Sequence, residues 1–492
     1  MRFAVWESEM FDKYLIDTHG FRTYREGGVA RGFEFGMRIA YYRGVALTII
    51  AGLKIRIDGD DVDGASIRLV VAGRVFTLEE AAREEDVRWE FDTAIIVRVL
   101  REGGLPAGAH DIAVEQRIKP AYMPPAVNFV GNAAKRITLV DSADGGSGQI
   151  MLGVSLYSYQ EEFYTRSLSL EDCLGEVASI GAQGVQLIGE QMMRGYPALS
   201  TNWVEAWHKG VERFGLTPTV LDTFVDVDCG GHRRLSLEEG VAKLVEQMQL
   251  AKLLGFPFIR PTTGPVEDAA PELIERALEH AERLGVAIAP EIHAPIELTG
   301  KYIESYLDLI SRTGTTKLGF TLDLGIFCRE IPLAAREQAL RHGAQADLVA
   351  YIHGAFRNGV PQGEVVETVR SRGGSDAAVR LAMHYKAFGP ASNRVEDLAR
   401  IVPHICNVHG KFYVMTPDAD EPTIPYREVI AALASGGYRG SIDSEYEGQR
   451  LTQDAFQTDS CEQVRRHHLM VRRMIAEAGA AAEIATEQSV AG

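Results

Sequence analysis

The chain has 492 residues, with 68 acidic and 51 basic side chains and a formal net charge of −17. This negative balance argues against nucleic acid or an anionic membrane surface as a partner, and the length allows roughly two to three domains. The five cysteines are widely spaced and form no CxxC pair, which favours a reducing compartment over a disulfide framework.

The N-terminal twenty residues carry acidic side chains where a signal peptide needs a basic end and an apolar core. No apolar run reaches the length of a membrane span. We therefore expect a cytoplasmic protein.

Residues 1–125 predict an all-β, sandwich-like domain. Their short runs alternate apolar and polar side chains, as strands with one buried face do, and turn pairs such as Asp58-Gly59 separate them. The clearest runs are residues 32–42, 47–59, 67–78, 94–100 and 110–118. The charged run 79–86 is expected to form an exposed loop or a short helix.

Residues 126–149 begin near paired prolines and end in a Gly/Ser-rich stretch, so we interpret them as a linker with room for one strand in the middle. After the linker, strand-length apolar runs alternate with amphipathic helices. The runs include GVSLYS, GVQLIGE, TPTVLDTF, FPFIRPTT, VAIAPE, LGFTLD, ICNVH and GSIDSE. Eight such units over residues 150–475 favour a (β/α)8 barrel over an open flavodoxin-like sheet, which needs fewer strands.

The connection between the predicted sixth and seventh barrel strands is longer than a βα unit requires. Asp323 and His409 are 86 positions apart, whereas a βα unit needs about thirty residues. The excess, about residues 330–400, is helical in pattern and is expected to form a lid or wall at the mouth of the barrel. Residues 476–492 are low in complexity and are expected to form a frayed tail.

Four potential metal ligands end four successive predicted strands. The carboxyl ends of barrel strands converge on one mouth, so side chains distant in sequence can bind one ion there. Three carboxylates and one imidazole favour Mn²⁺, Mg²⁺ or a similar divalent cation. The predicted ligands are Glu291, Asp323, His409 and Glu445.

Two residues stand two positions after a predicted ligand. His293 follows Glu291 and is a candidate catalytic base, or else a group that orients a ligand carboxylate. Lys411 follows His409 and could contact a substrate hydroxyl or oxyanion, with an ion pair to Glu445 as the alternative.

The sequence also predicts residues that contact the substrate. Glu190 ends the second predicted strand and Arg260 the fourth, although Arg260 fits a barrel-rim salt bridge equally well. His353 and Arg357 lie four apart on one helix face of the insert and would either close over substrate or face solvent. Glu447 is a substitute ligand if the strand register shifts by one pleat.

The segments PEIH, TLDLGIF, VHGKF and SEYEG resemble the xylose isomerase-like barrel superfamily over residues 150–475. The resemblance implies that Glu291, Asp323, His409 and Glu445 bind one divalent cation. A narrower resemblance comes from both ends of the chain. GFEFGMRIAYYRGVAL, VRWEF and YMPP resemble the small β subunit of bacterial C-glycoside deglycosidases, and DLGIFCREIP with its long insert resembles their α subunit.

The resemblance implies a lyase that acts on 3-oxo-glycosides supplied by a separate glycoside 3-oxidoreductase. A C-glycosidic bond has no leaving oxygen to protonate, so the usual two-carboxylate hydrolysis does not apply. A C3 ketone instead acidifies the C2 proton, and a cation can stabilise the resulting enediolate. His293 is then the expected base and Lys411 the oxyanion or hydroxyl contact.

Other functions remain open on the same barrel. A sugar isomerase or epimerase would use Glu291 and Glu445 on opposite faces of one carbon, and an inosose-type dehydratase would expel water. A barrel endonuclease is disfavoured by the negative charge and the single histidine ligand, and a keto-sugar binder would need a structural metal. The domain of residues 1–125 would line the active site or mediate assembly, and a homo-oligomer is expected on general grounds.

Overall fold

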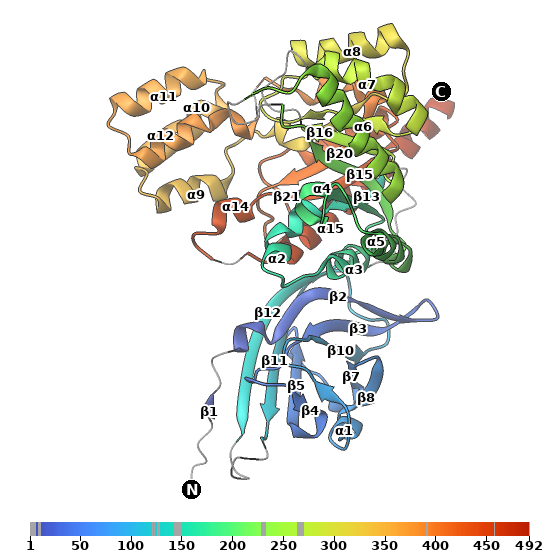
Figure 1. Ribbon diagram of the computed structural model, residues 1–492. Coiled ribbons are helices and arrows are strands. Elements are labelled where there is room, and N and C mark those ends of the chain that lie inside the picture. The colour runs from blue at the N-terminus through green and yellow to red at the C-terminus, as the bar shows by residue number, and fades with distance from the viewer. Residues whose placement is uncertain are drawn as a thin grey trace. The chain divides into compact units, whose positions relative to one another are not determined.

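The structure, a computed structural model, describes residues 6–7, 11–120, 122, 124, 128–141, 150–227, 233–262, 270–389, 392–456 and 458–491. The chain forms two compact units, shown in Figure 1. The first comprises Met1–Gly145 with Ser179–Gly181, and the second comprises Gly146–Ala178 with Ala182–Gly492.

The first unit contains two five-stranded sheets. One has the order β1 (Trp6–Glu7), β12 (Phe129–Leu139), β11 (Gly108–Ile118), β5 (Ile50–Ile57) and β6 (Asp60–Asp61). The other has the order β2 (Ile16–Glu26), β3 (Val29–Met37), β10 (Ile95–Leu100), β7 (Ile67–Val71) and β8 (Arg74–Thr77). The pair β4 (Val45–Ala46) and β9 (Arg88–Trp89), the helix α1 (Leu78–Ala81) and the 3₁₀ helices η1 (Asp12–Tyr14), η2 (Leu47–Ile49) and η3 (Gly64–Ser66) complete it.

Both sheets contribute to one apolar core. Alternate residues of β5, such as Ile55, and of β10, such as Val97, are buried in the same cluster. Apart from the parallel pair β1–β12, the strand pairs are antiparallel. The predicted antiparallel β domain is confirmed, and the period of two in its sequence is the physical reason, because it places every second side chain on the buried face.

The segment expected as a linker contributes a long strand. β12 lies within it and pairs with β11 along the full length of both strands, from Gly108–Leu139 to Ile118–Phe129. The Gly/Ser-rich residues 142–149 that marked the linker lie outside the described residues. Residues 129–139 thus belong to a sheet.

The second unit is built on a nine-stranded parallel sheet that curls into a barrel. Its order is β17 (Ala287–Ile288), β16 (Phe258–Thr262), β15 (Thr217–Phe224), β14 (Gly184–Ile188), β13 (Met151–Ser155), β21 (Ser441–Tyr446), β20 (Ile405–Phe412), β19 (Phe320–Asp323) and β18 (Glu291–Ile292). A parallel bridge joins Ile288 of β17 to Leu318, just before β19, so β17 and β18 both pair with the same segment of chain. β17 and β18 are therefore two parts of one fifth barrel strand, interrupted at Ala289-Pro290, where proline lacks the N–H that a ladder needs.

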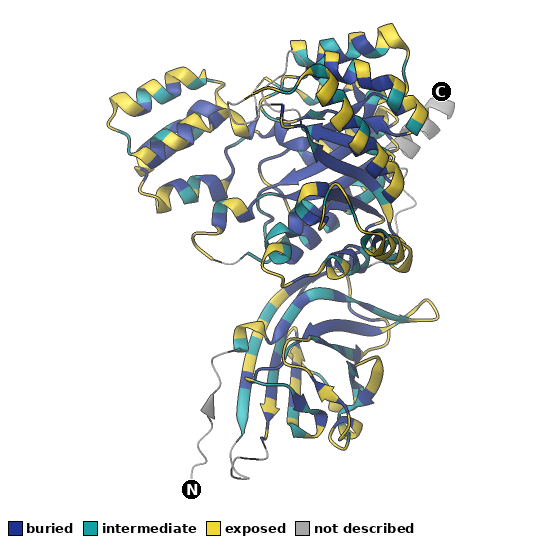
Figure 2. Ribbon diagram, viewed as in Figure 1, coloured by how far each residue is buried: buried dark blue, intermediate teal, exposed yellow. Residues whose placement is uncertain are grey.

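Helices surround the barrel strands. After the first two strands come η5 (Leu156–Tyr159), α2 (Gln160–Tyr164), α3 (Leu170–Ser179), α4 (Gly189–Met192) and α5 (Thr201–Phe214). Later units contribute α6 (Leu237–Leu254), α7 (Ala270–Leu284), α8 (Lys301–Thr313), α13 (Tyr426–Ser435), α14 (Gln449–Thr452) and α15 (Ser460–Ala491). Figure 2 shows the strands almost wholly buried and the helices exposed on one side, as the predicted fold requires. The segment expected as a frayed tail lies within α15, apart from residue 492, which lies outside the described residues.

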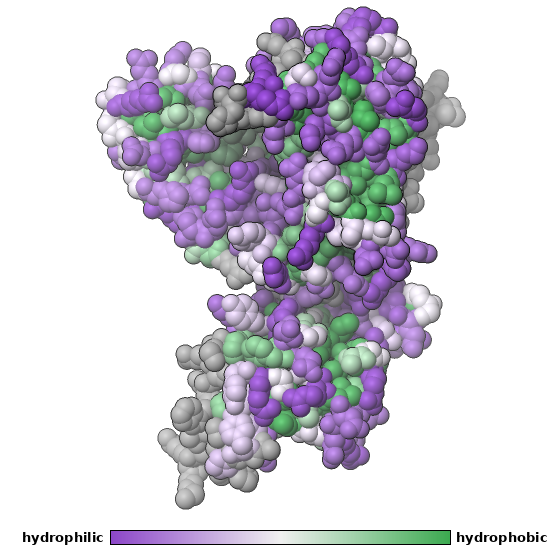
Figure 3. Space-filling model, viewed as in Figure 1, coloured by the Kyte–Doolittle hydropathy of each residue, from purple (hydrophilic) through white to green (hydrophobic). Residues whose placement is uncertain are grey.

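The long connection between β19 and β20 forms a helical insert. It contains η6 (Leu324–Phe327), α9 (Leu333–Arg341), α10 (Ala346–Arg357), α11 (Gln362–Ser371), α12 (Asp376–Met383), η7 (Tyr385–Phe388), η8 (Val395–Arg400) and η9 (Val402–His404). The Arg341 guanidinium pairs with Asp454, 2.8 Å away, which links α9 to the segment after α14. Hydrophilic side chains predominate over these helices in Figure 3.

Two neighbouring histidines of α15 are completely buried. His467 stacks on Phe412 of β20, its Nδ1 lies 2.9 Å from Ser444 Oγ, and its Nε2 lies 2.8 Å from the Tyr426 hydroxyl. Tyr426 in turn donates to the Lys411 carbonyl. Burial lowers the pKa of His467 to about 3 and that of His468 well below its usual value. Both imidazoles are therefore neutral in the folded chain.

These histidines predict a loss of stability in acid. The unfolded chain binds protons at both sites below about pH 6.5, whereas folded His467 does so only near pH 3. The stabilisation is present above pH 6.5 and is lost as pH falls, by about 2 kcal/mol at pH 5 for His467. Thermal unfolding at pH 7 and pH 5 should show this, and His467→Gln should flatten the dependence. An unchanged pH slope in His467→Gln would contradict the assignment, and exposed His208→Asn is the control.

No described helix is long and apolar enough to cross a membrane. Cys173, Cys328, Cys406 and Cys461 are free cysteines, and Cys229 lies outside the described residues.

Candidate metal centre

The four predicted ligands lie on adjacent barrel strands. Glu291 begins β18, the second part of the fifth strand, Asp323 ends β19, and β20 and β21 carry His409 and Glu445. Parallel pairing sets Asp323 beside His409, and His409 beside Asp443, two residues before Glu445. One potential ligand atom from each residue lies within 4.8 Å of the other three. The barrel thus gathers side chains that span 155 positions of sequence.

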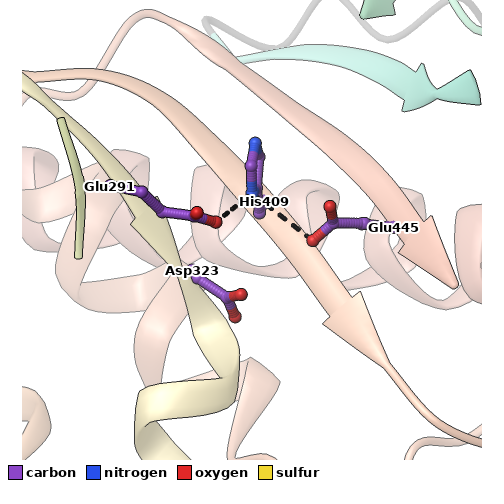
Figure 4. Close-up of side chains that lie close together, drawn as sticks. All are labelled: Glu291, Asp323, His409 and Glu445. Carbon is purple, nitrogen blue, oxygen red and sulfur yellow. Dashed lines mark hydrogen bonds and ion pairs between the residues drawn. The ribbon is translucent and has the colours of Figure 1, made fainter. Parts of the chain in front are cut away.

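Figure 4 shows His409 between two carboxylates. Its Nδ1 is 2.7 Å from Glu291 Oε1 and 3.4 Å from Glu445 Oε2. His409, Asp323 and Glu445 are buried, and the Glu291 side chain is partly exposed. Nδ1 is therefore the His409 nitrogen that faces the centre of the cluster.

Two members of the cluster, Asp323 and His409, hold protons more tightly than isolated side chains do. Burial raises the pKa of Asp323 to about 6 even though the nearby Lys411 lowers it. Burial lowers the pKa of His409, but the carboxylates of Glu445 and Glu291 outweigh this effect and raise it to about 9. For Glu291 burial is opposed by Arg260 and His409, which hold its pKa well below the usual value. A divalent cation would take the place of these protons.

The donor set fits a hard divalent cation. Three carboxylates and one imidazole are ligands of the kind that Mn²⁺, Mg²⁺ and related ions accept. Glu445 Oε2 is buried and accepts no hydrogen bond from the described residues, although the Lys411 ammonium pairs with it. One ammonium at 2.9 Å does not use every lone pair of this buried carboxylate oxygen, and a bound cation would use another. The geometry indicates a divalent metal site but does not specify the ion.

Lys411 is bound by carboxylates, as the ion-pair alternative expected. Its Nζ lies 2.8 Å from Glu447, 2.9 Å from Glu445 and 3.2 Å from Asp323. Burial lowers its pKa, but these carboxylates raise it well above the usual value. Lys411 is thus a fixed positive charge and not a proton acceptor. Glu447 also pairs with Arg450 and is not part of the cluster of four.

Arg260 is also engaged inside the barrel. Its Nε donates to Asp222 at 2.8 Å, and its Nη1 lies 3.2 Å from Glu291 Oε2. The side chain is 8% exposed, so the ion pair is buried in the barrel and not on its rim. This contact ties Arg260 to one of the predicted ligands.

His293 lies just beyond β18 and is exposed. Its Nδ1 is 2.7 Å from the Ala294 carbonyl oxygen, which can only accept, so Nδ1 carries the proton and Nε2 the lone pair. When protonated, His293 is near enough to Glu291 to help lower the pKa of that carboxylate, after the larger effects of burial, which raises it, and of Arg260 and His409, which lower it. This arrangement leaves Nε2 as the basic nitrogen.

The remaining predicted substrate contacts are not joined to the cluster. Glu190 is largely exposed in the first turn of α4, and the partial burial of its carboxyl group, followed by the Asp226 charge, raises its pKa. His353 and Arg357 both face Glu330, at 3.5 and 3.8 Å. Within the described part of the chain, no hydrogen bond or ion pair connects these three residues with the four predicted ligands.

Sequence reasoning missed two buried polar residues beside the cluster. Gln186 Nε2 lies 2.7 Å from His409 Nε2 and 2.6 Å from Asp222 Oδ2. Both side chains are fully buried. Their signal is visible in the sequence, because each is a polar residue inside an otherwise apolar strand, in GVQLI and in TVLD.

Comparison with known proteins matches the N-terminal and C-terminal parts of the chain to two different families. Residues 11–122 match the C-glycoside deglycosidase beta subunit family, and residues 174–466 match the xylose isomerase-like TIM barrel family. The 3'-dehydrocarminate deglycosidase alpha subunit of a Microbacterium species is 30% identical over 68% of this chain and 97% of its own length. The C-glycoside deglycosidase beta subunit of Eubacterium cellulosolvens is 30% identical over 24% of this chain and 80% of its own length.

A solved structure of a sugar phosphate isomerase/epimerase from Parabacteroides distasonis is also similar, with 13% identity and a TM-score of 0.42 over 67% of this chain and 96% of that one.

Proposed function

Because the chain belongs to the C-glycoside deglycosidase family, with a β-subunit domain and an α-subunit-type barrel in one polypeptide, we propose that it is a metal-dependent lyase acting on 3-oxo-glycosides. The observation that carries the proposal is the convergence of Glu291, Asp323, His409 and Glu445 within 4.8 Å at the strand ends of the barrel. We propose Mn²⁺ as the cation, with Mg²⁺ as a related alternative.

The proposed reaction is an elimination. A base removes the proton from C2, which the C3 ketone acidifies, and the electrons of that C–H bond form a C1–C2 double bond. The C1–aglycone bond breaks, and its electron pair leaves with the aglycone, which takes up a proton. When bound, the cation supplies positive charge to the negative oxygen that develops at C3. A separate oxidoreductase must have made the C3 ketone beforehand.

The chain's own residues have distinct parts in this scheme. His293 Nε2 accepts the C2 proton, because the Ala294 carbonyl holds the proton on Nδ1. Lys411 contacts a substrate hydroxyl or oxyanion as a permanent cation, while it balances the charge of the carboxylates beside it. Burial of Lys411 and of its partners Asp323 and Glu445 strengthens their electrostatic contacts.

The test is the identity of the products. Purified protein with Mn²⁺ is incubated with a 3-oxo-C-glycoside, and the mixture is separated by chromatography. The proposal expects free aglycone together with a 3-keto sugar that has a C1–C2 double bond. A C2 epimer without free aglycone would refute it in favour of an isomerase or epimerase.

His293→Ala should lose turnover and keep its metal. Removal of a general base costs roughly 10²–10⁴ in rate, whereas His293 is not among the four predicted ligands. Single-turnover rates and Mn²⁺ titration measure the two quantities separately. Full turnover in a variant that still binds metal would exclude His293 as the base.

A further inference from the structure

Three buried polar side chains from three neighbouring strands lie beside the cluster. Gln186 comes from β14, Asp222 from β15 and Arg260 from β16. Gln186 and Asp222 are fully buried and Arg260 is 6% exposed. Barrel interiors are usually filled by branched apolar side chains, so a charged pair here needs a reason.

Asp222 connects the other two. Its Oδ2 accepts from Gln186 Nε2 at 2.6 Å, and its Oδ1 accepts from Arg260 Nε at 2.8 Å. Each carboxylate oxygen of Asp222 therefore accepts a hydrogen bond from a side chain on a different strand. Asp222 holds Gln186 and Arg260 in fixed orientations.

The two partners each reach one predicted ligand. Gln186 Nε2 is 2.7 Å from His409 Nε2, and Arg260 Nη1 is 3.2 Å from Glu291 Oε2. His409 Nδ1 is in turn 2.7 Å from Glu291 Oε1. The contacts therefore form a closed ring of five side chains: Asp222, Gln186, His409, Glu291 and Arg260.

We infer that Asp222 is a positioning residue which, through Gln186 and Arg260, sets the orientations in which His409 and Glu291 meet the cation. The inference rests on the proposed metal-dependent function. Because the contacts form a ring, Asp222 constrains both predicted ligands. A substitution of Asp222 should therefore alter the orientation of the His409 imidazole and of the Glu291 carboxylate together. Hydrogen bonds to ligands from outside the metal shell orient them and tune their basicity in this way.

Stability alone does not account for this arrangement. The desolvation of a buried ion pair can exceed its attraction, and apolar replacement of such a pair is often neutral or stabilising. A barrel that needed only packing would hold apolar residues at positions 222 and 260. The orientation of His409 and Glu291 is the advantage that offsets the desolvation cost of burying the Asp222–Arg260 ion pair.

The test compares Asp222→Asn and Gln186→Met with a matched control. Asp443→Asn removes another fully buried barrel aspartate, which accepts from Thr219 and Asn407 and, among the described residues, makes no hydrogen bond or ion pair with the four predicted ligands. Mn²⁺ affinity is measured by electron paramagnetic resonance, and kcat and KM by aglycone release. Asn keeps the size of Asp222 but cannot accept both hydrogen bonds without turning a donor toward one partner.

We expect Asp222→Asn to weaken Mn²⁺ binding by roughly 10–100-fold and to lower kcat with little change in KM. Gln186→Met should act in the same direction and more weakly, since it leaves the Asp222–Arg260 pair intact. If Asp222→Asn does not fold, Gln186→Met decides the question alone. Asp443→Asn should keep an Mn²⁺ affinity closer to wild type than Asp222→Asn does, because the Asp443 charge acts on His409 without a hydrogen bond to it.

Three results would overturn the inference. The first is an Mn²⁺ affinity within about threefold of wild type in the folded variants, and the second is an equal loss in Asp443→Asn. The third is a rise in KM with unchanged affinity and kcat, which would assign Arg260 and its partners to substrate binding. A wild-type protein that binds no Mn²⁺ would instead refute the proposed function and this inference together.

Discussion

Removal of divalent cations with EDTA should abolish aglycone release from a 3-oxo-glycoside, and Mn²⁺ should restore it. Without a cation, the C3 oxygen would develop its charge beside Glu291, Asp323 and Glu445, which repel it. A metal contributes several kcal/mol to such charge stabilisation, so the rate should fall by roughly 10²–10⁴. Lys411 compensates only in part, because three carboxylates already share its ammonium group.

The measurement follows free aglycone by chromatography, with metal content determined in the same samples. Thermal unfolding provides an independent reading, since a ligand at 100 times its Kd stabilises the folded state by about 2.7 kcal/mol. The melting temperature should therefore rise when Mn²⁺ is added to stripped protein. Full turnover by protein shown to contain no stoichiometric metal would contradict the prediction.

Glu445→Gln should nearly eliminate turnover without destabilising the metal-free protein. The amide removes one of three negative charges around the cation, so Mn²⁺ affinity falls and the rate drops on the order of 10²–10⁴. The same change relieves repulsion with Asp323, whose pKa the Glu445 charge helps to raise after the larger effect of burial. Lys411 keeps two carboxylate partners, Asp323 and Glu447.

Glu304→Gln is the control for this variant. Glu304 lies on α8 of the same barrel and forms a surface pair with Arg400, which contributes about 0–1 kcal/mol. It should leave both Mn²⁺ binding and turnover unchanged. Wild-type Mn²⁺ affinity in Glu445→Gln would remove Glu445 from the ligand set, and a large fall in its metal-free melting temperature would assign it a structural role.

One chain here combines regions that match two separately named subunits. Residues 11–122 match the beta subunit family, while the similarity to alpha subunits extends over 68% of the chain. Joining the two regions in one polypeptide fixes their ratio at one to one and raises their effective concentration.

Much of the site was predictable because barrel geometry follows from pattern. Eight strand-length runs alternating with helices specify a barrel, and its strand ends meet at one mouth. The sequence alone therefore groups Glu291, Asp323, His409 and Glu445, and the structure brings them together. The extra length between Asp323 and His409 likewise indicated a helical insert, which the structure contains as α9–α12.

Other residues depended on contacts that no local pattern encodes. Lys411 had two possible roles in the sequence, and only the packing of β19, β20 and β21 shows that it pairs with three carboxylates. The break of the fifth strand at Pro290 and the pairing of residues 129–139 with β11 also required the three-dimensional structure.

The sequence by itself determined the barrel, the antiparallel β domain and the identity of the four clustered residues, because periodicity and strand-end position are local properties. The tertiary structure alone decided how these residues are held. The ring from Asp222 through Gln186 and Arg260 joins strands separated by up to 223 positions, and hydrogen bonds of 2.6–2.8 Å depend on side-chain orientations that spacing does not specify.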